Sequence, residues 1–242
     1  MFKSLSVVFP LYNEEHRLDK LFYEIINQKY LKKNNTEFIF VNDGSTDESL
    51  SMINNFLQKN KNKINIKILS YKNNKGKGFA LKKGIFSAKK DWVLTMDIDL
   101  SVKFNQLKIW ENKKFFRKDS FVYFGSRLLN NSRVKAKKYR AITGNIFNFI
   151  LTIIFDRKKL KIKDTQCGFK LYKRKIAKKI FLKSKENGYI NDLEILLLLI
   201  KNNIKIIELP VNWSHKSGSK INIITDSIIM FCQLLKLKLR FN

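Results

Sequence analysis

Two carboxylates stand one residue apart at the end of an apolar run. Asp97 and Asp99 follow Trp92–Leu94, which is typical of a buried strand. Because side chains alternate between the two faces of a strand, we expect both carboxylates to project from the same face. Like charges held that close repel each other unless a cation lies between them. Mg²⁺ and Mn²⁺ prefer such oxygen ligands, commonly together with substrate phosphates. The pair predicts metal ligands in an enzyme that handles a nucleoside diphosphate, with a surface turn as the alternative.

The elements before this pair alternate between strand and helix. Strands are expected at residues 5–9, 37–41, 64–71 and 92–96, and helices at 14–28, 47–57 and 79–88, the second helix capped by Thr46. This alternation predicts an α/β fold with a mostly parallel central sheet flanked by helices. Ligands of such sheets bind at the carboxyl ends of the strands. Pro10–Glu14, Asn42–Ser45 and Asp97–Asp99 all fall at that edge, so we expect one binding rim.

The rest of the chain is less regular. Strands are expected at residues 120–125 and 204–211 with a short run at 169–172, and helices at 142–155, 190–200 and 223–241. The last of these helices has one apolar and one basic face. We expect one catalytic domain over residues 1–221, with a nucleotide-binding half at about 1–101 and an acceptor half at about 102–221. An amphipathic helical extension over 222–242 completes the expected organisation.

Composition narrows the class of protein. The two cysteines, Cys167 and Cys232, have neither disulfide-framework nor zinc-site spacing, which favours a reducing compartment. The formal charge of +29 invites a nucleic-acid interpretation, but lysine and asparagine are spread through loops along the whole chain. We therefore expect no nucleic-acid partner. A biased composition explains the charge, or attraction to an anionic membrane surface, worth about 1 kcal/mol per nearby Lys or Arg.

Membrane contact is expected to be peripheral. We expect no targeting peptide, because a strand-like run begins by Leu5. No apolar stretch reaches the roughly 20 residues that a spanning helix requires. Residues 142–155 form the longest candidate and are interrupted by Gly144 and Asn148. That segment and residues 223–241 fit helices lying in the interface, with packing inside the protein as the alternative.

Polar residues at the first two strand ends suit a nucleotide. Asp43, beside Gly44, can accept hydrogen bonds from a base or a ribose hydroxyl, or instead form an Asx-turn. Glu14 could contact the ribose or favour the dipole of the following helix. Tyr12 could stack on the base or be a buried aromatic. These three residues are candidate nucleotide ligands.

A glycine-containing loop precedes the third expected helix. Asn74–Gly78 contains Gly-x-Gly, but Leu81 occupies the place of the third glycine of a dinucleotide fingerprint. The loop can still present backbone N–H groups and Lys77 to phosphates at a helix start, with a solvated turn as the alternative.

Charged residues of the C-terminal region are candidates for the acceptor side. Asp192, near the start of its expected helix, could contact the sugar or act as a general base, or simply cap the helix. Arg127, Arg140 and Lys220 could bind acceptor or leaving-group phosphates. His215 is interpreted as a surface or packing residue, with metal ligation as the alternative.

Motifs spread over nearly the whole chain carry a family resemblance. They lie at residues 8–15, 41–47, 74–80, 97–104, 125–127, 164–171, 191–196, 211–213 and 218–220. Together they resemble the inverting family-2 glycosyltransferases with the GT-A fold. Within that family the chain is most similar to the dolichyl-phosphate β-glucosyltransferase branch, a neighbour of the dolichyl-phosphate mannosyltransferases. The blocks 164–171 and 213–220 are the most specific to this branch.

The resemblance implies roles for matching positions. Nucleotide binding falls to Pro10, Tyr12, Glu14 and Asp43, the metal diphosphate to Asp97 and Asp99, and the acceptor phosphate to Arg127 and Arg140. Position 215 is histidine where an acidic residue is more usual, which leaves a third metal ligand open.

We therefore expect a metal-dependent inverting transferase using Mg²⁺ or Mn²⁺ at the cytoplasmic face of a membrane. It would move glucose from UDP-glucose onto a polyprenyl phosphate. A phosphate monoester has its second pKa near ~6, so this acceptor is a ready nucleophile that needs no base. Asp192 would be required only for a hydroxyl acceptor. The alternatives are GDP-mannose as donor to the same lipid, or a glycan hydroxyl as acceptor.

Overall fold

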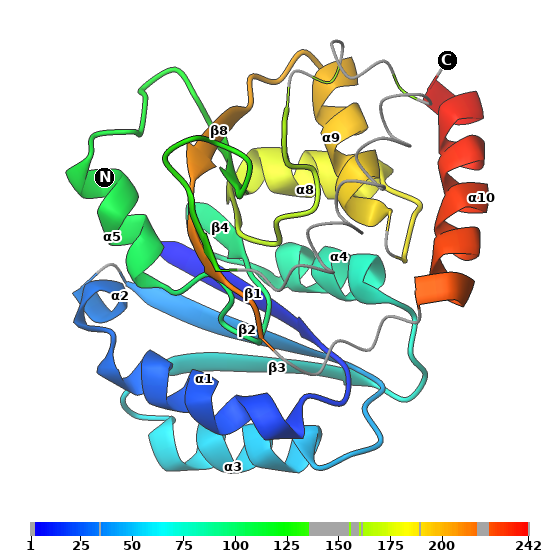
Figure 1. Cartoon of the computed structure of the whole chain (residues 1–242). Coiled ribbons are helices and arrows are strands. Elements are labelled where there is room, and N and C mark those ends of the chain that lie inside the picture. The colour runs from blue at the N-terminus through cyan, green and yellow to red at the C-terminus, as the bar shows by residue number, and fades with distance from the viewer. Residues whose placement is uncertain are drawn as a thin grey trace.

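The computed structural model describes residues 3–33, 35–135, 155, 160, 162–188, 190–216 and 223–241 (Figure 1). Its strands are β1 (Leu5–Leu11), β2 (Thr36–Asp43), β3 (Asn65–Tyr71), β4 (Trp92–Thr95), β5 (Val122–Ser126), β6 (Arg133–Lys135), β7 (Lys170–Lys173), β8 (Ile207–Pro210) and β9 (Asn212–Ser214). Its helices are α1 (Glu15–Asn27), α2 (Lys29–Lys33), α3 (Ser49–Asn60), α4 (Lys77–Ser87), α5 (Asn105–Asn112), α8 (Arg174–Lys183), α9 (Asn191–Lys201) and α10 (Ile223–Phe241).

A mixed sheet organises these elements. Within the described residues its order is β3-β2-β1-β4-β7-β5-β8, and β6 pairs with β9 in a separate two-stranded sheet. Strands β1 to β4 pair in parallel, and β5 pairs in parallel with β8. Only β7 is reversed, lying antiparallel to both β4 and β5. The expected α/β fold with a mostly parallel sheet flanked by helices is confirmed.

The sheet separates two hydrophobic cores because its side chains alternate between faces. Val7 and Phe9 of β1 belong to one core, whereas Val8 between them belongs to the other. The first core is covered by α1, α3 and α5, and the second by α4, α8, α9 and α10 (Figure 1). A Phe22–Phe56 ring stack, with centroids 4.0 Å apart, joins α1 to α3 under the first core.

The sheet forks where its strand order reverses. From β1 the chain proceeds outward to β2 and β3 on one side, and then returns to place β4 on the other side. Pairing of β1 with β2 continues to Leu11 opposite Asn42, but its pairing with β4 ends at Val8 opposite Thr95. The strands therefore part at their carboxyl ends. Such a switch point is where open α/β sheets hold ligands.

The structure corrects some local expectations. The helix predicted to begin after a Thr46 cap begins instead at Ser49, and Thr46 hydrogen-bonds across to Asn13. Helices α5 and α8 were not predicted. The apolar segment at residues 142–155 lies outside the described residues except for Phe155.

The last helix matches its predicted bounds, Ile223–Phe241. Leu234 and Leu237 are buried in the second core, so α10 packs on the domain along one face. None of the described helices is both long enough and apolar enough to span a bilayer.

Candidate active site

The loops after β1 and β2 are locked together at the rim. Asn13 has a φ of +54°, in the left-handed region that asparagine adopts more readily than most residues, and it bonds the neighbouring loop. Its Oδ1 accepts from the backbone N–H of Thr46 at 2.7 Å, and its own N–H donates to Ser45 Oγ at 2.9 Å. Asp47 Oδ2 accepts from the N–H of Glu15, and Glu15 returns a bond to the N–H of residue 48. These reciprocal bonds fix the two loops as one unit.

The predicted nucleotide ligands surround this unit. Pro10 lies beyond the last β1–β4 pair, and Tyr12 is 38% exposed beside it. The carboxylate of Glu14 accepts from Arg17 at 2.7 Å, and its N–H donates to Ser49 Oγ at 2.7 Å. The structure thus brings Pro10, Tyr12 and Glu14 to the forked edge. Their contact with a nucleotide stays a prediction.

Asp43 holds the loop that leads into α4. It is buried, and its two oxygens accept from the backbone N–H groups of Lys75 and Gly76, each at 2.8 Å. Gly76 has a φ of +96°, and a Cβ there would lie 2.3 Å from the carbonyl oxygen of Asn187. Only glycine fits this position. Asp43 therefore sets the place from which Lys77, the first residue of α4, projects.

Lys77 and Asp97 meet at the fork. The Lys77 Nζ lies 2.7 Å from Asp97 Oδ1, and both side chains are partly exposed, by 37% and 42%. Burial alone would raise the pKa of Asp97, but the charge of Lys77, helped by Lys170 and Arg127, outweighs it and holds that pKa below its ordinary value. Asp97 is therefore ionised at neutral pH.

A cluster of carboxylates also acts on Lys77. Burial opposes the charge of its ammonium group, yet Asp97, Asp192 and Asp99 outweigh that effect and raise its pKa. Residues from three elements, the start of α4, the end of β4 and the start of α9, thus form one electrostatic centre. Sequence reasoning named Asp97 and Asp99 as a pair and Lys77 and Asp192 each separately, and the fold brings the four together.

The expected geometry of the carboxylate pair is wrong in one respect. Strand β4 ends at Thr95, so the alternation of a strand does not extend to Asp97 and Asp99. The chain turns instead, with Leu100 at a φ of +55°. The carboxylate of Asp99 accepts from both the N–H and the hydroxyl of Ser101, at 2.8 and 2.7 Å. The two carboxylates therefore have different partners.

The donor set still suits a hard cation. Within the part of the chain that the structure describes, no group of three or more His, Cys, Asp or Glu side chains gathers around one metal position. Mg²⁺ commonly takes only one or two carboxylates and completes its shell with water and substrate phosphates. Asp97 and Asp99 match that requirement. His215 packs beside the Trp213 ring, with centroids 6.3 Å apart.

A glycine lies directly against the Asp97 carboxylate. A Cβ at Gly168 would stand 2.4 Å from Asp97 Oδ2. The carbonyl oxygen of Gly168 accepts from the hydroxyl of Thr95 at 3.1 Å, which ties this loop to the end of β4. The loop after residue 164 therefore sets one wall of the centre.

Asp192 is paired with a buried lysine that sequence reasoning missed. Lys170 of β7 is 1% exposed, and its Nζ contacts Asp192 Oδ1 and donates to the carbonyl oxygen of Thr165 at 3.1 Å. Its ammonium also lies 4.9 Å from the centroid of the Phe124 ring. The available signal was a single lysine inside the apolar run at 169–172, because such a residue is buried only when paired.

Arg127 forms an ion pair with a carboxylate of the protein itself. Its Nε and Nη2 donate to the two oxygens of Asp164 at 2.7 and 2.8 Å, and its guanidinium lies 5.8 Å from the Trp213 ring centroid. Burial alone would raise the pKa of Asp164, but Arg127 outweighs it and holds that pKa below its ordinary value. Arg140 and Lys220, the other predicted phosphate ligands, lie outside the described residues.

Comparison with known proteins agrees with this arrangement. The family model described as glycosyl transferase family 2 matches residues 6–181. The dolichyl-phosphate beta-glucosyltransferase of Dictyostelium discoideum is 35% identical over 246 residues, which cover 98% of this chain and 74% of that protein. The human protein of that name is 31% identical over 258 residues, covering 99% of this chain and 76% of that protein.

Solved structures agree on the fold. Glucosyl-3-phosphoglycerate synthase from Mycobacterium tuberculosis superposes with a TM-score of 0.70 at 17% identity, covering 98% of this chain and 80% of that one. The same enzyme in complex with Mn²⁺, UDP and glucosyl-3-phosphoglycerate gives a TM-score of 0.68 at 16% identity, covering 98% and 79%. The mostly parallel sheet flanked by helices, together with the family match, thus defines a glycosyltransferase of the GT-A fold. More particularly, the chain belongs to glycosyl transferase family 2.

Proposed function

We propose that this protein transfers glucose from UDP-glucose to a polyprenyl phosphate, with inversion at the anomeric carbon. The proposal is supported by relatives named dolichyl-phosphate beta-glucosyltransferases, which match nearly the whole chain. The glucosyltransferase relatives favour UDP-glucose as the donor, while structural neighbours include complexes with UDP and with GDP-Man.

One observation carries the choice of acceptor. Asp192, the carboxylate placed to serve as a base, is paired with the buried ammonium of Lys170. A general base has to aim a lone pair at the proton it removes, and the Lys170 contact fixes the Asp192 carboxylate through one of its two oxygens in a structural ion pair. An acceptor hydroxyl would need such a base. A phosphate monoester would not, because it is largely a dianion at neutral pH.

The reaction then balances without a proton transfer. An oxygen of the acceptor phosphate attacks the anomeric carbon from the side opposite the donor diphosphate. The new carbon–oxygen bond forms as the bond to the diphosphate breaks, and UDP departs with the electron pair. Because the nucleophile enters as an anion, the products are UDP and the lipid-linked glucosyl phosphate.

The residues at the fork would have different roles in the reaction. Asp97 and Asp99 would hold Mg²⁺ or Mn²⁺, which offsets the charge that develops on the leaving diphosphate. Lys77, at 2.7 Å from Asp97, would add a second cation at the phosphates. Nucleotide binding falls to Pro10, Tyr12, Glu14 and Asp43. Arg127, already oriented by Asp164, would face the acceptor phosphate with Arg140 and Lys220.

The proposed setting is the cytoplasmic face of a membrane, where the protein is held peripherally. The lipid acceptor requires access to a bilayer, and the formal charge of +29 would attract the protein to anionic lipids. The apolar surface of α10 that lies away from the core would add to this attraction.

A donor-by-acceptor assay tests the proposal. The protein with Mn²⁺ receives labelled UDP-glucose or GDP-mannose, and either polyprenyl phosphate or the corresponding alcohol, and label extracted into organic solvent is counted. We expect extraction only with UDP-glucose and the phosphate. Label extracted with GDP-mannose would identify GDP-mannose as the donor instead of UDP-glucose. Label extracted with the alcohol would show that the acceptor is a hydroxyl instead of a phosphate. No extraction in any arm would contradict the proposal.

A further inference from the structure

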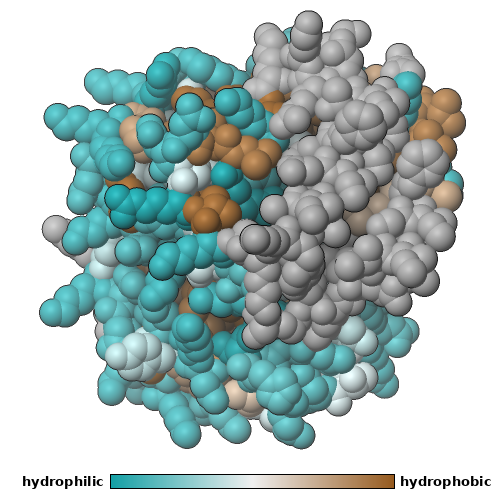
Figure 2. Space-filling model, viewed as in Figure 1, coloured by the Kyte–Doolittle hydropathy of each residue, from teal (hydrophilic) through white to brown (hydrophobic). Residues whose placement is uncertain are grey.

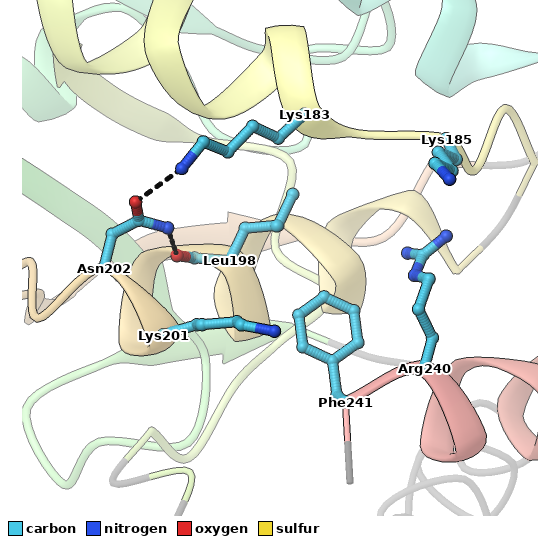
Figure 3. A pocket seen from close by; sticks show the side chains of 7 residues that line it. All are labelled: Lys183, Lys185, Leu198, Lys201, Asn202, Arg240 and Phe241. Atoms are coloured by element: carbon cyan, nitrogen blue, oxygen red, sulfur yellow. Dashed lines mark hydrogen bonds between the residues drawn. The ribbon is translucent and has the colours of Figure 1, made fainter.

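A charged cavity lies away from the active site. It has a volume of about 350 Å³, is open to solvent, and is lined by residues at the ends of α8, α9 and α10. Four cations, Lys183, Lys185, Lys201 and Arg240, surround an apolar floor of Leu198 and Phe241 (Figure 3). We call it the basic pocket.

The basic pocket keeps an excess of positive charge. Arg240 is neutralised, because its guanidinium contacts the buried carboxylate of Glu194 and lies 3.6 Å from Glu186. Lys183 donates only to the neutral side chain of Asn202, at 2.8 Å. Within the described residues, Lys185 and Lys201 make no ion pair. The four cations and these two carboxylates leave a net charge of +2 around the cavity.

The basic pocket is distinct from the reaction centre. Asp192 lies in the first turn of α9, whereas Lys201 is the last residue of the same helix. At 1.5 Å per residue these positions stand about 14 Å apart along the helix axis. A ligand of the basic pocket therefore does not occupy the place of the donor or of the reacting phosphate.

Apolar side chains stand exposed next to the pocket residues. Leu182, just before Lys183, is 66% exposed, and Leu239, just before Arg240, is 81% exposed. Leu235, one turn earlier on α10, is 43% exposed. Figure 2 shows apolar atoms at the surface along the edge where α10 lies. Large apolar side chains beside a cluster of cations are the pattern of a surface that meets a bilayer.

We propose that the basic pocket binds the phosphate of an anionic phospholipid while Leu182 and Leu239 enter the interface beside it. Lysine binds phosphate as a point charge, and three such groups around an apolar floor match a headgroup phosphate joined to its acyl chains. This inference deepens the proposed function, on whose membrane setting it rests, by naming where the protein meets the lipid.

Vesicle flotation tests the proposal. The vesicles are phosphatidylcholine alone or with phosphatidic acid, and the variant is Lys185→Gln/Lys201→Gln. The matched control is Lys61→Gln/Lys63→Gln, two exposed lysines in the turn after α3, on the far side of the sheet (Figure 1). At about fivefold for each cation near an anionic surface, we expect the pocket variant to bind about 25-fold more weakly and the control to change by no more than about twofold.

The outcomes separate the possible ligands. An equal loss in both variants would assign binding to diffuse charge and overturn the proposal, as would the absence of wild-type binding. Binding of inorganic phosphate to the wild-type protein, without binding to phosphatidic acid vesicles, would mean that the pocket takes free phosphate rather than lipid. Binding of RNA that only the pocket variant loses would overturn the lipid assignment in favour of nucleic acid.

A second readout follows the apolar side chains. Cys232 is exposed on α10, whereas Cys167 is buried and burial raises its pKa to about 12, so a thiol-directed polarity-sensitive dye labels Cys232. We expect its emission to shift to the blue with phosphatidic acid vesicles. Leu239→Ser should remove most of that shift, and the unchanged emission of such a variant would contradict insertion of this face.

Lipid binding by the basic pocket and the proposed sugar transfer can be contradicted by different results. Transfer to a short-chain polyprenyl phosphate in detergent requires no vesicle, so we expect the Lys185→Gln/Lys201→Gln variant to keep wild-type turnover there. Absence of transfer by the wild-type protein would remove the function and leave the flotation result standing. Loss of transfer by the pocket variant in detergent would contradict a role confined to lipid binding.

Discussion

The N-terminal region (residues 3–101) and the C-terminal region (residues 102–216) hold their functional side chains by different means. In the first, Asp43 accepts from two backbone N–H groups, and Asn13 bonds the loop at residue 46. In the second, Arg127 pairs with Asp164, and α9 is anchored to β7 through a buried lysine. The N-terminal region relies mainly on its own backbone, and its Lys77–Asp97 pair is partly exposed, whereas the C-terminal region relies on ion pairs with a buried member.

This difference has energetic consequences. A lost hydrogen bond to a backbone group costs about 1–3 kcal/mol, whereas one member of a buried ion pair removed alone costs about 3–5 kcal/mol. The C-terminal region should therefore respond more strongly to single substitutions and to acid. Single substitutions in the N-terminal region should each lower the free energy of unfolding by a smaller amount.

The largest effect is expected where the two regions meet. Asp99→Ala removes a proposed ligand of the metal diphosphate, and loss of such electrostatic stabilisation should lower transfer on the order of 10³-fold. Since the hydrogen bonds of the Asp99 carboxylate stay within its own turn, at Ser101, the melting temperature should change little. Asp91→Ala, at an exposed aspartate, serves as the control in the same radiochemical assay. Transfer above a tenth of the wild-type rate would remove Asp99 from the reaction centre.

The second largest effect is expected at Gly168, which lies against the Asp97 carboxylate. Gly168→Ala would place a methyl group against the Asp97 carboxylate, and a displacement of about 1 Å at a reacting centre can cost ~10²-fold in rate. Gly188→Ala is the control, because a Cβ there meets only the flexible side chain of Gln233, at 3.4 Å and beyond. Initial rates of both variants at saturating donor measure the difference. Equal rates would show that the Asp97 position tolerates movement.

The buried ion pair should show the cost of one unpaired charge. Lys170→Met or Asp192→Asn alone should lower the free energy of unfolding by about 3–5 kcal/mol, and the double variant should recover most of that loss. Urea denaturation followed by circular dichroism measures all three proteins. We also expect the folded double variant to retain transfer to polyprenyl phosphate. Complete loss of transfer in a folded double variant would assign Asp192 a chemical role and count against the phosphate acceptor.

Acid should act mainly through the charge pairs. The pKa of Asp164 is lower in the folded protein than its unfolded value near ~3.9, so its ion pair contributes stability above that pH, which is lost as the pH falls through the folded pKa. Asp97 acts in the same direction. Asp164→Asn should be less stable at pH 6 and lose less stability between about pH 4 and pH 2. Parallel stability curves for the wild type and this variant would contradict the assignment.

The smallest effect is expected in the backbone-anchored region. Asp43→Asn replaces one acceptor oxygen by an amide nitrogen and should cost about 1–3 kcal/mol, below the loss from Lys170→Met. It should also raise the KM for the donor, because the loop that bears Lys77 is released. Asp19→Asn, at an exposed position of α1, is the matched control. A loss as large as that of Lys170→Met would erase the contrast between the regions.

The contrast also explains what the sequence could predict. The parallel unit of the first region follows from local periodicity, and β1, β3 and α1 were placed within two residues of their ends. The reversed strand β7 was not foreseen, because a short apolar run does not encode which strands it pairs with. Helix α8 was missed because basic residues interrupt its apolar positions. The end of β4 at Thr95, which overturned the alternation argument for Asp97 and Asp99, depends on a turn that no periodicity signals.

The site residues also fall into those that local sequence features predict and those that only the fold brings together. Strand ends are local features, so Asp43 and Asp97 could be named as neighbours of one edge before the fold was known. The ion pairs of the C-terminal region join positions far apart in the chain: Lys170 lies 22 residues before Asp192, and Arg127 lies 37 residues before Asp164. No spacing rule connects such residues, and only the assembled sheet brings them within bonding distance.

The reciprocal bonds between the loops after β1 and β2 bear on attempts to redesign this protein. A change of donor specificity would naturally begin by grafting the segment around Asn13 from another sugar transferase. Such a graft alone would leave the N–H groups at residues 46 and 48 without the acceptors that Asn13 and Glu15 supply. The two segments, more than thirty residues apart in sequence, have to be exchanged together as a single module.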